Sequence, residues 1–182
     1  MIAFNLKNQK GFTLLEALVA ISILMVAVVA PITIAQKGLS SATYSKNQLI
    51  ASYLAQDAIE YIKNKRDVIS INNNFDWNNL SVFGNSTTKT LCFSVNGCQI
   101  DTNIGAGAGE IRAITATPLG VLSKNTDGFY GFDSPEKTNF TRKINIKLQT
   151  VDGENNEALV TVTVNWGSSE NEVVVRTLIY NY

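Results

Sequence analysis

Hydrophobic and polar positions divide the first third of the chain into three stretches. Residues 1–11 are short and polar, and residues 12–35 are almost wholly apolar. Beyond them, apolar side chains recur at helical spacing with polar residues between, at Ile50, Leu54, Ala58, Tyr61 and Ile62. This pattern predicts one long helix over residues 12–66, apolar all round in its first half and amphipathic in its second.

The predicted helix is too long for a compact domain of this size. At about 1.5 Å per residue its 55 or so residues extend for roughly 80 Å, so we expect the first half to project from the rest. The apolar run alone gives roughly 36 Å, enough to cross a hydrocarbon core of about 30 Å once. Lys7 and Lys10 precede the run. The positive-inside rule therefore leaves the N-terminus in the cytoplasm and exports the remainder.

Two helix-weakening residues lie near the end of the apolar run. Pro31 removes one backbone hydrogen bond and crowds the carbonyl of Ala27. Gly38 follows seven residues later and weakens the same region. We expect a kink at Pro31 and Gly38. The alternative is a segment that melts when the helix is pulled or repacked.

Turn and strand patterns replace the helical pattern after Asp67. Residues 72–79 have the composition of a loop, and residues 90–95 and 110–117 are candidate strands. Asn96-Gly97 is a strong hairpin signal, after which Cys98 starts a return strand. Cys92 and Cys98 flank this turn. They indicate a disulfide across or beside the hairpin if the domain is exported, and two thiols if it is cytosolic.

The C-terminal part alternates more clearly. Three runs of alternating or β-prone residues are separated by turn-forming residues at 152–156 and 167–171. Their apolar positions include Phe140, Ile144, Ile146, Leu148, Val160, Val162, Val164 and Trp166, with Arg142 among them and residues 173–180 as the third run. We expect an antiparallel meander whose apolar face packs on the amphipathic half of the helix. This arrangement is an α+β fold.

Composition and charge exclude several functions. The 182 residues allow one ordinary domain with an anchor, and their 45% hydrophobic and 16% charged content fits a protein held partly in lipid or in an assembly. The chain has no histidine, which removes the commonest general base and most zinc chemistry. Without Lys7 and Lys10 the acids outnumber the bases by two. That balance disfavours a nucleic-acid partner.

Weaker signals do not change this interpretation. Lys124, Lys137, Arg142, Lys143 and Lys147 are the only local excess of cations. Asp152, Glu154 and Glu157 do not match an EF-hand, and the glycine-rich residues 105–109 lack the lysine of a phosphate-binding loop. We therefore expect no catalytic residues, no metal site and no cofactor.

The strongest motif is Lys10-Gly11-Phe12-Thr13-Leu14-Leu15-Glu16 followed by the apolar run. It resembles the cleavage and methylation motif of type IV prepilins: a short basic leader, Gly before the cut, Phe after it, Glu at the fifth mature position and a retained apolar helix. The helix over residues 51–67 and the strand ends at residues 165–166 and 178–181 resemble minor pilins of the pilus modification protein group. Over the head, this second resemblance is one of pattern only.

The resemblance implies a processing and assembly pathway. A prepilin peptidase that is also an N-methyltransferase cuts between Gly11 and Phe12, and Phe12 becomes the methylated N-terminus. Glu16 then pairs with the N-terminal amine of a neighbouring subunit. The implied segments are a cleaved leader (residues 1–11), a transmembrane and assembly helix (12–36), an amphipathic helix packed on the head (37–70) and a β-rich head (71–182).

The sequence thus predicts a structural minor pilin-like subunit of a type IV pilus or related envelope filament. It spans the bacterial cytoplasmic membrane once, with the head outside the cytoplasm, before it joins other pilins through its helix. The alternative is a pseudopilin of a type II secretion system or of a DNA-uptake filament. A membrane-anchored enzyme is disfavoured, because no nucleophile and base converge in the pattern.

Overall fold

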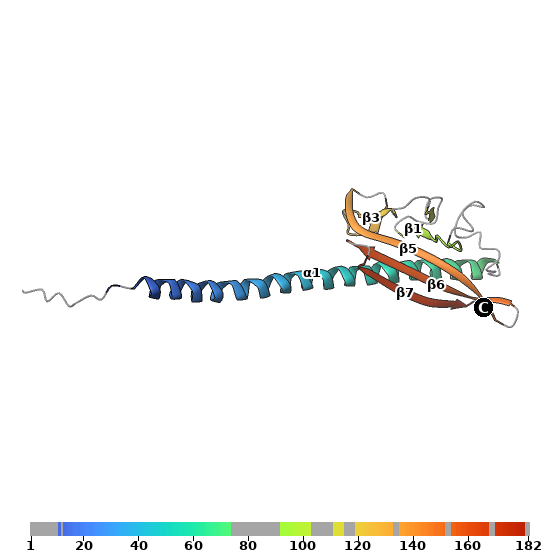
Figure 1. The fold of residues 1–182 in the computed structure, drawn as a ribbon. Coiled ribbons are helices and arrows are strands. Elements are labelled where there is room, and N and C mark those ends of the chain that lie inside the picture. Colours follow the sequence, from blue (N-terminus) through green and yellow to red (C-terminus); the bar gives the residue numbers. More distant parts are fainter. Residues whose placement is uncertain are drawn as a thin grey trace, which may run out of the picture. The chain divides into compact units, whose positions relative to one another are not determined.

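The computed structural model describes residue 11 and residues 13–73, 92–102, 111–114, 119–132, 135–151, 154–167 and 170–180. The chain divides into two compact units, Met1–Ser45 and Lys46–Tyr182, each taken by itself below. The described residues form one helix and seven strands (Figure 1). The leader, Phe12, the predicted loop at 74–79 and the glycine-rich residues 105–109 lie outside the described residues.

Helix α1 comprises Leu14–Asn73, 60 residues. The predicted long helix is confirmed, but its predicted end at Arg66 is wrong, since seven further residues are helical. The buried face of the helix continues past Ile62. Arg66, one turn later, is buried, and Ile69, two turns later, is partly buried. Polar residues interrupt the apolar pattern after Arg66, and the sequence therefore predicts an earlier end of the helix.

The C-terminal meander is confirmed. Strands β5 (Glu136–Val151), β6 (Glu154–Trp166) and β7 (Glu172–Tyr180) pair antiparallel in sequence order. The register pairs Ile144 with Val162 and Val162 with Val175, so the apolar positions of the three strands share one face. Thr161 and Thr163 lie on the opposite face, as their alternation predicts.

Four short strands extend the sheet beyond the other edge of β5. They are β1 (Cys98–Ile100), β2 (Ile111–Ala113), β3 (Val121–Lys124) and β4 (Tyr130–Gly131), in a sheet of order β2-β1-β5-β3-β4 with β6 and β7 on the other side of β5. Of these, β1 and β3 pair with β5 directly. Strand β2 falls within the predicted strand at residues 110–117. The predicted strand at residues 90–95 is wrong, because residues 92–95 form turns and a bend. No periodic pattern in the sequence predicts β3 and β4.

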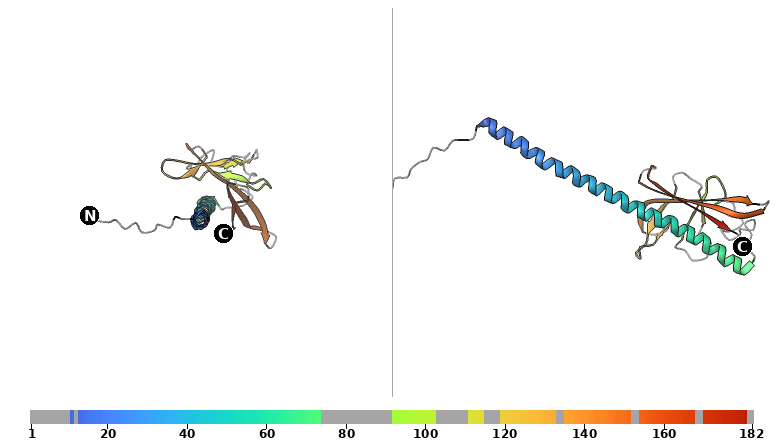
Figure 2. Two further views of the ribbon diagram at one scale, coloured as in Figure 1. Left: turned by 60° about the vertical axis from the view of Figure 1, so that its left-hand side comes forward. Right: turned by 90° about the horizontal axis from the view of Figure 1, so that it is seen from below.

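The core of the second unit lies between the sheet and residues 51–62 of α1. The helix contributes Ala51, Leu54, Ala55, Ala58, Ile59 and Ile62, and Ile50 and Tyr61 pack against them in part. The three alanines are completely buried. Because alanine presents only a methyl group, larger side chains of the strands fill this interface, among them Ile144, Val162 and Trp166. Figure 2 shows the sheet curving around this part of the helix.

Candidate functional site

The first turn of α1 is closed by Thr13. The Thr13 hydroxyl oxygen accepts a hydrogen bond from the backbone N–H of Glu16 at 3.3 Å, and the Thr13 carbonyl accepts one from Ala17 at 3.1 Å. Thr13 is thus the N-cap and Glu16 is the third helical residue, which is the sequence spacing of a capping box. The Thr-x-x-Glu spacing could have revealed this cap from the sequence. A carboxylate in the first turn also interacts favourably with the helix dipole.

Beyond this turn, the helix presents an almost wholly apolar surface as far as Ala35. Every described residue from 13 to 45 is exposed, and no charged residue occurs between Glu16 and Lys37. The described residues contain one helix long and apolar enough to cross a membrane, by length and composition. A continuous apolar surface of this length requires lipid or other proteins around it.

The other predicted residues of this unit have the following surroundings. Gly11 is exposed, and, its chain neighbours aside, no described atom lies within 4 Å of the place where a side chain would begin. Pro31 and Gly38 both lie within α-helix. Near Pro31, the hydroxyl of Thr33 donates to the carbonyl of Ala30 at 2.8 Å. The kink expected at Pro31 and Gly38 stays a prediction.

In the second unit, the most unusual side chain is Arg142 of β5, which is completely buried. Its Nη1 donates to the backbone carbonyl of Leu54 and to Asp57 Oδ2, each at 2.9 Å. Its Nη2 donates to the carbonyl of Ile100 at 2.7 Å and to the hydroxyl of Thr102 at 3.3 Å. One guanidinium therefore joins α1, the end of β1 and β5.

The charge balance around Arg142 is asymmetric. Burial lowers the pKa of Arg142, whereas the hydrogen bond and charge of Asp57 and the charge of Asp101 act to raise it. The Asp57 side chain is half exposed, at 50%, so water screens part of its charge. Arg142 Nε has no hydrogen-bond partner in the described structure. The guanidinium thus depends on Asp57 as its direct counter-charge.

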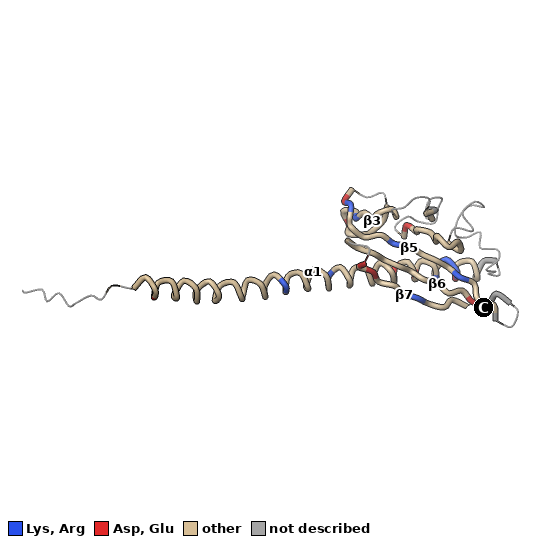
Figure 3. Tube along the Cα trace, viewed as in Figure 1, with Lys and Arg blue, Asp and Glu red and all other residues tan. Residues whose placement is uncertain are grey.

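This burial corrects one interpretation made from the sequence. In the sequence, Arg142 belongs with four lysines to a local excess of cations, but its side chain is not on the surface. Lys143 and Lys147 do lie on the face of β5 opposite the core, and the described charges of the head are of both signs on several elements (Figure 3). The described surface therefore offers less basic character than the sequence indicated.

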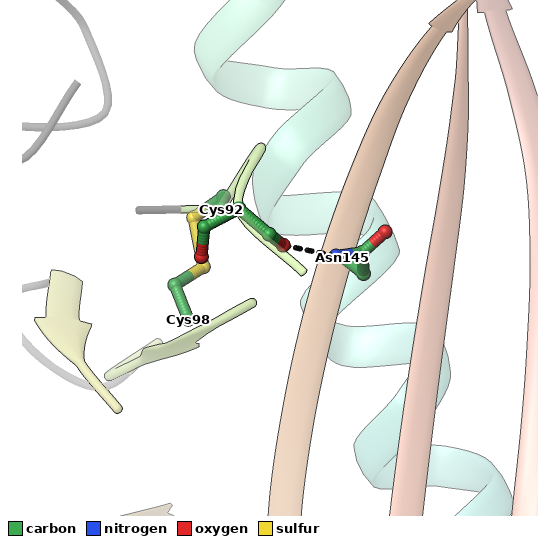
Figure 4. The surroundings of a disulfide bond; sticks show 4 residues. Cys92, Cys98 and Asn145 are labelled. Atoms are coloured by element: carbon green, nitrogen blue, oxygen red, sulfur yellow. Dashed lines mark hydrogen bonds between the residues drawn. A yellow bond between two sulfur atoms is a disulfide. The ribbon is translucent and has the colours of Figure 1, made fainter. Parts of the chain in front are cut away.

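Cys92 and Cys98 form a disulfide, with their Cα atoms 4.6 Å apart. The loop that they close lies against β5: Ile146 N–H donates to the Cys92 carbonyl at 2.8 Å, and the Asn145 side chain donates to the Ser94 carbonyl at 2.6 Å (Figure 4). Gly97 closes a turn onto Ser94 with φ +71°. The Asn96-Gly97 turn thus lies within a loop that covers the edge of β5, not between two strands of a hairpin.

No candidate metal centre occurs among the described residues, where no group of three or more Cys, Asp and Glu side chains could hold an ion. Asp152 lies outside the described residues, and Glu154 has only its backbone described.

Comparison with known proteins identifies the N-terminal segment. Residues 6–30 match the family model of the prokaryotic N-terminal methylation motif, a match that includes Gly11, Glu16 and the first turns of α1. No curated protein and no solved structure matches the chain. The apolar N-terminal helix and this motif fit a single-pass, membrane-anchored pilin. The chain therefore carries the N-terminal methylation motif of type IV pilins and pseudopilins, on an α+β fold of the pilin kind.

Proposed function

We propose that the chain is a minor pilin-like structural subunit of a type IV pilus or a related envelope filament. The observation that carries the proposal is the continuity of the methylation motif at residues 6–30 with a helix whose apolar residues are all exposed as far as residue 45. A prepilin motif implies processing by a prepilin peptidase and a membrane-inserted helix. In such a protein the helix performs the assembly, and no chemical reaction is required of the head.

Processing takes place at Gly11. The peptidase cuts between Gly11 and Phe12, and the amine of Phe12 is then methylated. The absence of a side chain at Gly11, with open space around it, lets a protease approach the backbone closely. Because the cut lies before the apolar run, the helix stays in the membrane, whereas an ordinary signal peptide loses its apolar region.

Assembly uses Glu16. A carboxylate at the centre of a bilayer raises the free energy of insertion by about 2.5–3.5 kcal/mol on insertion scales, and by less near the interface. In a filament, the N-terminal amine of a neighbouring subunit offsets this unfavourable term. Apolar helices can pack at several offsets along one another, and a single charge pair favours one of them.

The processing step is tested with Gly11→Asp in cells that contain the assembly system. The expected result is loss of the size shift between precursor and mature chain on a gel, because the carboxylate obstructs the peptidase. Gly38→Ala is the control, since Gly38 also has open space around it and lies well beyond the cut. Normal maturation of Gly11→Asp rejects the proposed cut site.

The assembly step is tested with Glu16→Gln. Glutamine keeps the side-chain oxygen that can accept a hydrogen bond at the third residue of a capping box, but it removes the charge. We expect normal processing and a strong reduction of the chain in the sheared filament fraction. Glu60→Gln serves as the control, because Glu60 is an exposed acid on the same helix. Equal incorporation of both variants contradicts the pairing of Glu16 with an amine.

The alternative, a pseudopilin of a secretion or DNA-uptake filament, has the same motif and fold. A DNA-binding role would depend on surface cations such as Lys143, Lys147 and Arg176, which occupy outward positions on β5 and β7. The burial of Arg142 leaves this group smaller than the sequence indicated. Retention of duplex DNA by the purified protein, with a steep loss of binding as salt rises, would favour that role.

A further inference from the structure

A cavity of about 450 Å³ opens on the second unit, beside the buried Arg142. Four of its lining residues, Ile50, Tyr53, Leu54 and Asp57, follow one face of α1 at helical spacing. The others are Thr102, after β1, and Gly128, Phe129 and Tyr130, from the β3–β4 connection and β4. The volume is within the range of small-molecule sites in proteins.

The walls are mainly apolar and aromatic. Tyr53 and Phe129 are 63% and 62% exposed, so both side chains are accessible from solvent. Tyr130 is held in place by an edge-to-face contact with the ring of Phe140, at 6.1 Å between centroids. Three aromatic residues around one cavity favour a ligand with an apolar body, a positive charge, or both.

The carboxylate of Asp57 gives the cavity its polarity. Asp57 Oδ2 accepts hydrogen bonds from Arg142 Nη1 at 2.9 Å and from the Thr102 hydroxyl at 2.5 Å. Asp57 Oδ1 has no hydrogen-bond partner among the described residues. Because Arg142 is itself anchored to two backbone carbonyls, the carboxylate is fixed in orientation before any ligand arrives.

The available groups select the ligand. The Thr102 hydroxyl already donates its hydrogen to Asp57, so these two lining side chains offer a ligand an acceptor and no free donor. An anion would meet this acceptor unfavourably. A sugar would leave most of its hydroxyl groups against apolar walls, without partners. An ammonium group on an aliphatic stem satisfies both the carboxylate and the walls.

Other charges near the cavity are compatible with a cation. Asp101 is buried and accepts a hydrogen bond from the Phe132 N–H at 3.0 Å. Asp127 lies in the turn before Gly128. Lys124 is the competing cation, since its Cε lies 3.8 Å from the position of a Cβ added at Gly128. The three carboxylates, Asp57, Asp101 and Asp127, outnumber the two cations, Arg142 and Lys124, so these five groups carry one net negative charge.

We propose that this cavity binds a primary alkylammonium group, with the ammonium on Asp57 Oδ1 and the stem between Tyr53, Phe129 and Leu54. The chemistry is that of a lysine side chain of another polypeptide or of a free aliphatic amine. The proposal does not depend on the role of the N-terminal helix.

The test uses the full chain in lipid nanodiscs with ¹³C-labelled isoleucine and leucine methyl groups. Butylammonium should shift the methyl resonances of Ile50 and Leu54 with a millimolar dissociation constant, as expected for so small a ligand. The methyl resonances of Ile179, buried in β7, should stay in place. 1-Butanol, which has nearly the same shape and no charge, should bind at least about fivefold more weakly.

Variants then assign the binding to the cavity. Phe129→Ala and Tyr53→Ala should each weaken butylammonium binding about threefold to tenfold, while their exposure leaves the fold intact. Tyr180→Ala is the matched control, because Tyr180 is 46% exposed on β7 and does not line the cavity. Equal shifts with butanol and butylammonium overturn the proposal. So do absent shifts, or equal weakening by Tyr180→Ala and Phe129→Ala.

Two further ligands distinguish the sources of the ammonium group. A lysine blocked as N-acetyl methylamide carries the group as a polypeptide does, and 1,4-diaminobutane carries it as a free amine. Binding of the blocked lysine supports a protein partner. Binding of the diamine alone supports a free amine, because the backbone amides of the lysine are then excluded from the cavity. Failure of both contradicts the proposal.

Discussion

The buried guanidinium of Arg142 should make the stability of the head depend on Asp57. We predict that Asp57→Asn destabilises the head by about 3 kcal/mol in the natural chain. In an Arg142→Met background we expect the same substitution to change the free energy of unfolding by less than about 0.5 kcal/mol. Asparagine keeps the shape of the side chain and one oxygen acceptor, so the charge is the main difference.

The magnitude follows from the geometry. Arg142 Nη1 and Asp57 Oδ2 are 2.9 Å apart. Coulomb's law at this separation gives roughly 6 kcal/mol for an effective dielectric constant of about 20 and roughly 1.4 kcal/mol in water. The Asp57 side chain is half exposed, which places the interaction between these values, at about 3 kcal/mol. Without the guanidinium, Asp57 is a half-exposed acid that water can solvate, and its charge contributes little.

The assay is urea denaturation of the full chain in a mild detergent, followed by the fluorescence of Trp166. Trp166 is 3% exposed in β6 and should respond to unfolding of the head. A Trp77→Phe background leaves it as the sole tryptophan, because the chain has two. Glu60→Gln is the control and should change stability by less than about 0.5 kcal/mol. An equal effect of Asp57→Asn in both backgrounds would refute the reasoning.

Three further predictions concern local structure. Replacing Cys92 and Cys98 together with Ser should lower the free energy of unfolding by about 2 kcal/mol, as expected for a loop with sequence separation 6, and a reductant should destabilise the natural chain but not the variant. Gly97→Ala should destabilise the head by more than about 2 kcal/mol in the same assay, because the new Cβ overlaps the Ile144 carbonyl oxygen; Gly128→Ala, with φ +92° and 3.8 Å to its nearest neighbour, should have an effect of only about 1 kcal/mol. Thr13→Val should speed hydrogen exchange at the Glu16 amide about fivefold, since the cap loses its acceptor, while Thr33→Val leaves that amide unchanged.

Long, regular patterns were predictable from the sequence. The meander of β5, β6 and β7 follows from strict alternation over many residues, which fixes the inward face of each strand. Strands β3 and β4 have only 4 and 2 residues, too few for a period to show. Their connection is held by Asn125, whose side-chain oxygen accepts hydrogen bonds from the N–H groups of Asp127 and Phe129. Turn chemistry of this kind was the signal available there.

Contacts between distant segments were not predictable. Alternation placed Arg142 at an inward position, yet a charge at such a position has no explanation until its partners are known. Asp57 is 85 residues away in sequence, and Leu54 is 88. No spacing rule joins residues so far apart. At the other end of the chain, Glu16 could be interpreted early, because its motif is contiguous and its cap is only three residues distant.

The disulfide loop on β5 gives the head a dependence on its cellular compartment. Disulfides form in oxidising environments and are rare in the cytosol. Before oxidation, residues 92–98 must be ordered against β5 without the constraint of the Cys92–Cys98 bond. The absence of this constraint makes the native head less stable by about 2 kcal/mol. For a head exported as proposed, full stability is therefore gained only after crossing the membrane. A chain still on the cytoplasmic side keeps the edge of β5 more weakly covered, and hence more open to pairing with other strands.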